Sequence, residues 1–210
     1  MMSLVGGGPT VREARIFEVG AVTAVLAEAF LDGDLADWLV PHRERRRAVY
    51  ADYFLIWAEF FLIHGQVDTT EDLDAVALWW PVGNKLVMDI PDYDERLAKA
   101  TGDALDRFVS LDMTMDLHHP MDKPHHYLAF LAVHPDRQGE GLGSALLAHH
   151  LGQLDADGVP AYLEATGTRN RMLYVRHGYK LLMPVTIPDG PDLYPMWRPP
   201  HTGVPQHRPV

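Results

Sequence analysis

Three glycines at alternate positions have the clearest chemical meaning in the sequence: Gly139, Gly141 and Gly143. Glycine lets the backbone turn sharply, so several N–H groups can point at one place. Apolar residues at helical spacing predict a helix from Leu142, whose N-terminus adds the positive end of its dipole. The segment is therefore a candidate anion cradle suited to a pyrophosphate. We expect a side chain at Gly141 or Gly143 to hold the phosphate away.

More than one kind of nucleotide-derived ligand fits such a cradle. A P-loop is disfavoured, because no Lys-Ser or Lys-Thr pair follows the glycines. The run from Gly139 to Ser144 is one residue from the G-x-G-x-x-G pattern of dinucleotide-binding proteins, and Glu164 lies where a ribose-binding acid would be. Against this, residues 135–138 separate the preceding apolar run from the glycines, and too little chain follows for a doubly wound half. On this stretch alone the dinucleotide alternative stays open.

Two motifs taken together resemble the GCN5-related N-acetyltransferase superfamily. Gln138-x-x-Gly141-x-Gly143, preceded by Val133-x-Pro135, resembles its acetyl-CoA signature. Downstream, the segment from Asn170 to Tyr179 resembles its N-x-x-x-Y-x-x-x-G-[FY] pattern, with Tyr174 as the central tyrosine. Further stretches resemble the subgroup that includes puromycin N-acetyltransferase: residues 29–47, 118–120, 126–128 and 159–165.

The resemblance implies acetyl-CoA as co-substrate. It implies that the pyrophosphate is bound by the backbone amides of Gln138, Gly139, Glu140, Gly141, Leu142, Gly143 and Ser144. It also implies that the backbone of Leu131, Ala132 and Val133 pairs with the pantetheine arm where two parallel strands splay apart. Tyr174 would donate a proton to the departing thiolate; the alternative is a core aromatic. Asn170 would bind the cofactor arm or cap a helix, since Asn is a good N-cap.

The proton acceptor and the acceptor pocket are less well defined. An alkylammonium must lose a proton before it attacks a thioester, and a carboxylate, a histidine or water can take it. Glu164, at the end of a predicted strand, is the first choice and His134 the second, unless no residue is required. The pocket candidates are Trp80, at a strand end before a proline, together with His119 and His134. A metal at the histidines of residues 118–126 has little geometric support, because their proline-flanked loop offers no helical i, i+4 pair.

Alternating strand and helix patterns must position these residues. A nearly unbroken apolar run over 126–133 predicts a central strand, followed by a helix over 142–157 and a strand over 161–165, so these two strands are expected to be parallel neighbours. Other helices are expected near 18–31, 43–64, 92–101, 103–117 and 170–177, and strands near 11–17, 66–70, 75–80, 180–187 and 192–197. Pro195 predicts an edge position or a bulge for the last strand.

The sequence thus predicts a mixed α/β fold: a twisted, mostly antiparallel sheet with a central splayed parallel pair and helices on both faces. We expect one acetyltransferase domain over residues 11–198 with its CoA-binding core at 125–180, a flexible N-terminus at 1–10 and a Pro-rich tail at 199–210. The net charge of −11 disfavours nucleic acid and suits a cationic acceptor. With no cysteine and no apolar run long enough for a membrane span, the cytoplasm is the expected location.

The expected activity is direct transfer of an acetyl group from acetyl-CoA to a primary amine of a small molecule. The absence of cysteine argues against a covalent acyl-enzyme. A non-catalytic acyl-CoA sensor is the alternative. The identity of the amine and the oligomeric state, a homodimer included, stay open.

Overall fold

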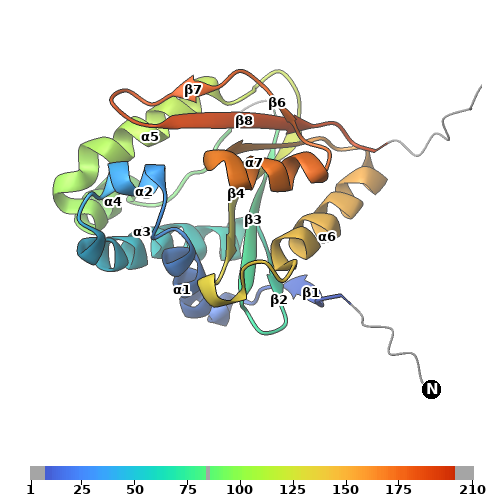
Figure 1. The fold of residues 1–210 in the computed structure, drawn as a ribbon, viewed down its shortest axis with the longest axis horizontal. Helices are drawn as coiled ribbons and strands as arrows, with labels where there is room; N and C mark the ends of the chain where they lie inside the picture. Colours follow the sequence, from blue (N-terminus) through green and yellow to red (C-terminus); the bar gives the residue numbers. More distant parts are fainter. Residues whose placement is uncertain (1–7, 84–85, 202–210) are drawn as a thin grey trace, which may run out of the picture.

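One mixed sheet forms the centre of the protein (Figure 1). The computed structural model describes residues 8–83 and 86–201, so most of the expected flexible N-terminus and Pro-rich tail lies outside the described residues. In the described part the sheet has eight strands in the order β1-β2-β3-β4-β5-β8-β6, with β7 paired to β8. Their bounds are β1 Val11–Glu13, β2 Gln66–Thr70, β3 Ala75–Val82, β4 His125–Val133, β5 Ala161–Ala165, β6 Lys180–Leu181, β7 Val185–Thr186 and β8 Asp192–Arg198.

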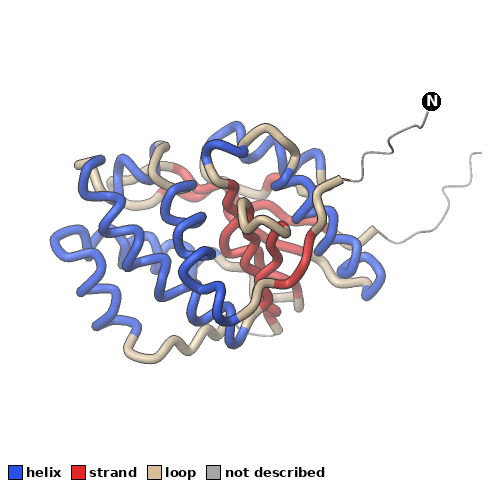
Figure 2. Tube along the Cα trace, turned by 90° about the horizontal axis from the view of Figure 1, so that it is seen from below, coloured by secondary structure: helices blue, strands red, loops and turns tan. Residues whose placement is uncertain are grey.

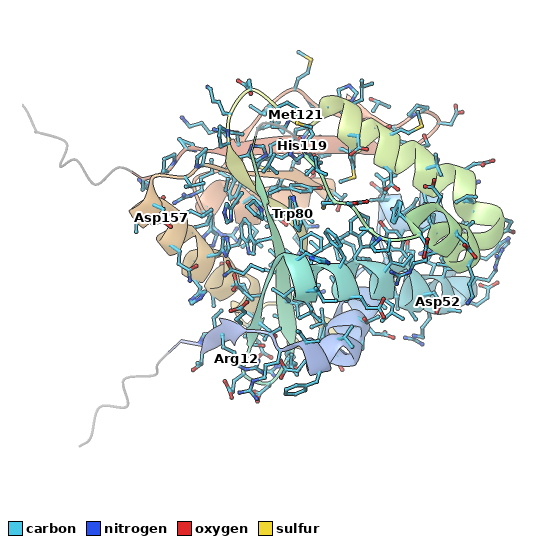
Figure 3. All side chains as sticks on the ribbon, turned by 180° about the vertical axis from the view of Figure 1, so that it is seen from behind. Arg12, Asp52, Trp80, His119, Met121 and Asp157 are labelled. Atoms are coloured by element: carbon cyan, nitrogen blue, oxygen red, sulfur yellow. The ribbon has the colours of Figure 1, made fainter. Side chains whose placement is uncertain are left out.

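Helices cover both faces of this sheet (Figure 2, helices in blue and strands in red). They are α1 Val19–Ala29, α2 Asp34–Leu39, α3 Arg43–His64, α4 Tyr93–Thr101, α5 Leu105–His118, α6 Leu142–Asp157 and α7 Gly167–Arg176, with short 3-10 turns η1 Ile16–Glu18, η2 Gly102–Ala104 and η3 Pro135–Arg137. Alternate residues of β3 face opposite layers: Val76 and Leu78 join the core under α1 to α5, whereas Ala77 and Trp79 join the core under α6 and α7. Side chains fill the space between the layers (Figure 3).

The expected elements of the CoA-binding core are confirmed. Helix α6 spans Leu142–Asp157 and β5 spans Ala161–Ala165, as predicted, and β4 runs parallel to β5 while the other strand pairs are antiparallel. Helix α6 ends because Gly158 takes the left-handed conformation, with φ of +69°. Helix α7 begins three residues earlier than expected, and the short helix α2 was not predicted.

The prediction that Pro195 places the last strand at an edge is wrong. Strand β8 lies between β5 and β6 and pairs with both. The carbonyl of Pro195 accepts a hydrogen bond from Leu182 N at 2.8 Å, so its imide nitrogen faces the same side. Strand β6 has already ended at Leu181 there, and the missing N–H interrupts no ladder.

Strands β4 and β5 pair over a short stretch and then separate. Their paired residues are His126 with Ala161 and Tyr127 with Tyr162 in the described part of the chain. On its other side, β4 pairs Leu128 with Trp79 and then Phe130 with Leu78, which leaves Ala129 as a bulge. A bulge bends its strand and increases the local twist. The bulge therefore coincides with the point where the parallel pair opens.

Candidate active site

The glycine segment forms a cradle of free backbone amides at the start of α6. Gly139 and Gly141 have φ of +90° and +85°, a conformation that side chains disfavour. None of the N–H groups from Gly139 to Ser144 donates to a backbone carbonyl of the described residues. Six such amides at a helix N-terminus are an arrangement that binds phosphate oxygens. The amide of Gln138 differs from the prediction, because it donates to Pro135 O at 3.4 Å within the 3-10 turn.

Gly143 lies where α6 faces β4. A Cβ at this position would point at Val133 Cγ2, 3.5 Å away, and at the side chains of Leu131 and Leu173, 3.9 and 3.7 Å away. These are ordinary van der Waals distances, so a Cβ here would face the side chains between α6 and β4. The effect of a side chain at Gly143 on phosphate binding stays a prediction.

Side chains brace the cradle loop from outside. Arg137 pairs with Asp74 and donates to Glu140 at 2.9 Å, and these carboxylates raise its pKa. Gln138 Nε2 donates to Val133 O at 3.3 Å. Because Arg137 is held by two carboxylates, the positive potential of the cradle comes from backbone amides and the helix dipole.

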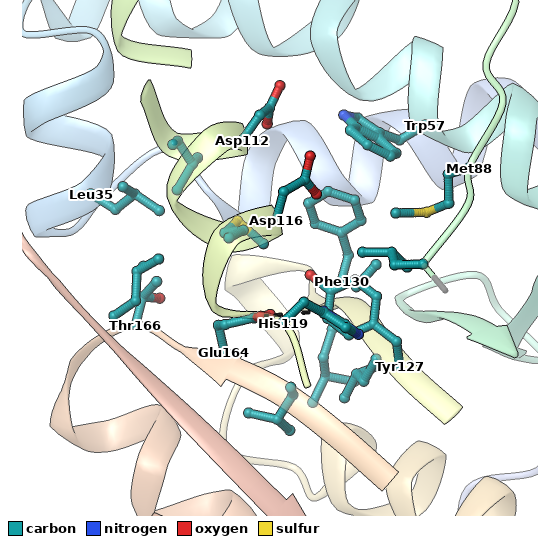
Figure 4. Close-up of a pocket in the computed structure, with 18 of the residues that line it drawn as sticks. Leu35, Trp57, Met88, Asp112, Asp116, His119, Tyr127, Phe130, Glu164 and Thr166 are labelled. Atoms are coloured by element: carbon teal, nitrogen blue, oxygen red, sulfur yellow. Dashed lines mark ion pairs between the residues drawn. The ribbon is translucent and has the colours of Figure 1, made fainter. Parts of the chain in front are cut away.

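A cavity of about 610 Å³ opens where β4 and β5 separate. It brings together Glu164 from β5, Tyr174 and Asn170 from α7, His119 from the end of α5 and Leu131 from β4. Figure 4 shows Glu164 and His119 side by side at one end of the cavity, with Asp112 and Asp116 of α5 on its wall. His119 thus shares one space with Glu164, Asn170 and Tyr174, which lie 45 to 55 positions later in the sequence.

Trp80 and His134 do not belong to the described lining of this cavity. The Trp80 ring packs on Phe60 with centroids 5.0 Å apart, so it belongs to the contact between α3 and the sheet. His134 begins the 3-10 turn and its Nδ1 accepts from Asp136 N at 3.4 Å. Trp80 and His134 are therefore not in the positions predicted for pocket residues.

Tyr174 and Asn170 reach the cavity from neighbouring turns of α7. Burial raises the pKa of the Tyr174 phenol, which keeps its proton available for donation. Asn170 Nδ2 donates to Thr166 O at 3.0 Å, and Thr166 itself is the N-cap of α7. Asn170 is therefore not the helix cap, which was one of its two expected roles.

Glu164 is a buried carboxylate without a hydrogen-bond partner. Its side chain is 5% exposed, and neither oxygen has a hydrogen bond of good geometry within the described residues. The hydroxyls of Tyr127 and Tyr162 lie near it, and burial together with this carboxylate raises the pKa of both phenols. The nearest basic atom is His119 Nδ1, 3.8 Å from Oε1, a distance for an ion pair and too long for a hydrogen bond. An uncompensated buried carboxylate is costly, and such groups concentrate at functional sites.

The cavity wall is acidic and aromatic, which sequence reasoning missed. Asp89, Asp112 and Asp116 line it with Glu164, and no lysine or arginine is among its described lining residues. Asp112 accepts a hydrogen bond from the Tyr93 hydroxyl at 2.7 Å, and burial raises the pKa of Asp112 to about 6. The i, i+4 spacing of the α5 aspartates is the sequence signal that could have revealed this wall.

Comparison with known proteins places this geometry in a family. The model of the acetyltransferase (GNAT) domain matches residues 103–181. An uncharacterized N-acetyltransferase of Schizosaccharomyces pombe is 24% identical over 183 residues, which cover 80% of this chain and 72% of the relative.

Solved structures are similar over nearly the whole chain. A Corynebacterium glutamicum protein described as histone acetyltransferase HPA2 and related acetyltransferase is 30% identical, with a TM-score of 0.66 and coverage of 94% of this chain and 99% of that one. Arylalkylamine N-acetyltransferase 2 of Aedes aegypti has a TM-score of 0.64 at 14% identity, covering 92% and 99% of the two chains. A polyamine N-acetyltransferase of Drosophila melanogaster has a TM-score of 0.58 at 16% identity, covering 90% and 97%.

The last two similarities are to the fold, whereas the first is also a similarity of sequence. The resemblance to the puromycin N-acetyltransferase subgroup stays a prediction. The free-amide cradle, the splayed strands and these matches agree: the chain belongs to the GCN5-related N-acetyltransferase superfamily and is an acetyl-transferring enzyme.

Proposed function

We propose that this enzyme moves an acetyl group from acetyl-CoA to the primary amine of a small cationic molecule, which attacks the thioester directly. The main support is the single cavity that holds Tyr174 and the unpartnered Glu164 beside the opening between β4 and β5. A proton acceptor and a proton donor in one cavity suit an attack by an amine and the departure of a thiolate.

The chain offers a fitting place for the cofactor. The free amides of residues 139–144 would hold the pyrophosphate. The edge of β4 at Leu131, Ala132 and Val133, beyond its last pair with β5, would bind the pantetheine amides, with Asn170 near the arm. Acetyl-CoA, when bound, supplies the acetyl thioester and a thiolate leaving group.

The proposed roles of Glu164 and Tyr174 follow from whether each side chain can accept or donate a proton. Glu164 takes a proton from the acceptor ammonium and so frees the electron pair of its nitrogen. The phenol of Tyr174, kept protonated by its burial, would hydrogen-bond the departing sulfur and protonate it. The second proton, which the nitrogen loses as the amide forms, would return to the Tyr174 oxygen and restore the phenol. The cavity wall of residues 112 and 116 holds the acceptor in place through its charge.

The lining of the cavity favours a cationic acceptor with an apolar body. Four acidic residues face it without lysine or arginine, and Trp57, Tyr93 and Phe130 supply aromatic faces that attract cations. The structural neighbours named for arylalkylamines and polyamines act on molecules of this general kind.

The test is thiol release from acetyl-CoA with a panel of primary amines. We expect turnover of amines that combine a cation with an apolar body. Tyr174→Phe should lower kcat about 100-fold while CoA binding stays unchanged. Tyr179→Phe is the matched control, since Tyr179 packs on Tyr174 with ring centroids 5.8 Å apart but lies outside the described cavity lining. Full activity of Tyr174→Phe would contradict the role of Tyr174, and CoA binding without turnover of any amine would favour a sensor.

The cradle has a separate test in two glycines with different backbone conformations: Gly141 has a positive φ, and Gly152 lies within helix α6. Gly141→Val should abolish CoA binding, because a φ of +85° is strained for valine and the loop would have to change its conformation. No neighbouring atom lies within 4 Å of the added Cβ, so we expect the rest of the protein to stay folded. Gly152→Ala, inside α6 and also in open space, should leave CoA binding intact and stabilise the protein by about 0.5–1 kcal/mol. Calorimetric titration with CoA distinguishes them, and normal binding by Gly141→Val would show that the cradle is elsewhere.

A further inference from the structure

Behind Glu164 lies a pair of buried histidines that direct transfer does not by itself require. His119 Nε2 and His125 Nε2 are 3.0 Å apart, and His125 Nδ1 is 2.8 Å from the carbonyl of Lys123. The His119 side chain and His125 are each 1% exposed. Glu164, His119, His125 and the Lys123 carbonyl therefore form one row of polar groups leading away from the cavity.

The partners of these rings determine their tautomers. A carbonyl only accepts, so His125 Nδ1 must carry a proton. In neutral His125 the other nitrogen, Nε2, then accepts the hydrogen bond that His119 Nε2–H donates. This leaves the unprotonated Nδ1 of neutral His119 facing the Glu164 carboxylate at 3.8 Å. Two basic groups face each other there, and one added proton turns their repulsion into attraction.

The surroundings of the pair suit a cation that is shielded from water. The His119 ring lies at steep angles, 85° and 74°, to the rings of Tyr127 and Tyr162, with centroids 4.8 Å away in each case. His125 lies 5.2 Å from the ring of Trp197. Neighbouring aromatic rings can stabilise a protonated imidazole. Among the described residues, no group of three or more His, Cys, Asp or Glu side chains is arranged to hold a metal ion.

We propose that His119 and His125 hold the proton that Glu164 takes from the acceptor ammonium. The N–H bond of the ammonium breaks, its electron pair stays on nitrogen, and the proton passes through a Glu164 oxygen to His119 Nδ1. The resulting imidazolium is stabilised by its Nε2–H bond to His125, and Glu164 is an anion again. The proton returns to water after the product leaves, which balances the one proton released per acetylated ammonium.

This inference rests on the proposed role of Glu164 and adds two positioning residues to it. It explains why a carboxylate with no hydrogen-bond partner is buried against a histidine whose ring is fixed by three neighbours. The titratable groups facing His119 are Asp116 on α5, His125 and Tyr127 on β4, and Tyr162 and Glu164 on β5.

The first experiment compares an amine that needs deprotonation with one that does not. His119→Gln is assayed with phenethylamine, an ammonium at neutral pH, and with β,β-difluorophenethylamine, which is largely neutral. We expect kcat/KM to fall at least about tenfold for the first amine and less than twofold for the second. His118→Gln, whose ring bonds Thr114 O within α5, is the matched control and should match the wild type with both. Equal losses with both amines would mean a merely structural role and would overturn the proposal.

The second experiment needs no turnover. Nitrogen NMR of histidine-labelled enzyme should find neutral His125 protonated at Nδ1 and neutral His119 at Nε2. Glu164→Gln should shift the imidazole nitrogen resonances of His119, because the group that faces its Nδ1 has changed. A His119 that carries its neutral proton on Nδ1, or resonances insensitive to Glu164→Gln, would overturn the proposal. Absence of any acetylation would instead count against the proposed function, since the NMR spectrum reports on the pair alone.

Discussion

Two consecutive histidines of β4 lead to opposite faces of the sheet, and the networks that they enter differ. On the α6 face, His126 Nδ1 contacts His150 Nε2 at 3.1 Å, and His150 Nδ1 donates to Asp68 at 2.9 Å. The His150 ring stacks on Trp79 with centroids 4.0 Å apart and an angle of 4°. Gln66 donates to the other oxygen of Asp68 at 3.0 Å. This network satisfies its carboxylate completely.

On the cavity face, His125 leads through His119 to Glu164, whose two oxygens have no partner in the described part of the chain. Both carboxylates are about equally buried, at 1% and 5% side-chain exposure. A satisfied buried network stabilises a fold, whereas an unsatisfied group at a cavity is available for a substrate. The two rows of histidines therefore differ in whether the carboxylate at their end is satisfied, and not in how deeply they are buried.

The largest effect should come from removing the unsatisfied carboxylate. Glu164→Gln is expected to lower kcat/KM for an amine by about 100- to 10,000-fold, since no group then takes the ammonium proton. The free energy of unfolding should not fall, because a buried charge without a hydrogen bond contributes no stability. Steady-state kinetics and urea unfolding measure the two quantities, and a large loss of stability would make Glu164 a structural residue.

The satisfied carboxylate should give the opposite result. Asp68→Ala leaves the buried His150 Nδ1–H without an acceptor and is expected to lower the free energy of unfolding by about 3 kcal/mol. At a temperature where the variant stays folded, kcat/KM should change less than about threefold. A variant that keeps its stability but loses activity would reverse the comparison between the two faces.

A smaller effect should appear in the pH dependence of stability. Burial, with the nearby His150, lowers the pKa of His126 to about 4 from 6.5. The unfolded chain then binds a proton between these values that the folded chain does not, so the free energy of unfolding decreases as pH falls from about 6.5 to about 4. Below that range this contribution is fully lost. Urea unfolding at stepwise pH should find a shallower decrease in His126→Asn, and an unchanged slope would assign the effect to other groups.

Sequence alone predicted the local parts of the site and missed those that depend on register. Glycines with positive φ, the α6 bounds and the shared region of Glu164 and Tyr174 follow from short patterns. Which face a strand residue takes depends on every bulge before it. The bulge at Ala129 has no clear signature in an apolar run, and the position of Trp80 opposite this stretch could not be inferred. The pairing of His119 with His125 likewise depends on how a loop folds back.

The separation of β4 from β5 has a consequence for the energetics of the whole molecule. Beyond Tyr127 and Tyr162 the parallel ladder stops. On that side, the backbone N–H and C=O groups of the rest of β4 have no hydrogen-bond partners from β5. In the proposed binding mode acetyl-CoA supplies them and acts as a strand. Binding to the folded state alone then adds about 2.7 kcal/mol of stability at a hundredfold excess over Kd. Amide hydrogen exchange at the β4 edge should become slower as the cofactor concentration rises. The free energy of unfolding of the enzyme should then increase with the concentration of acetyl-CoA.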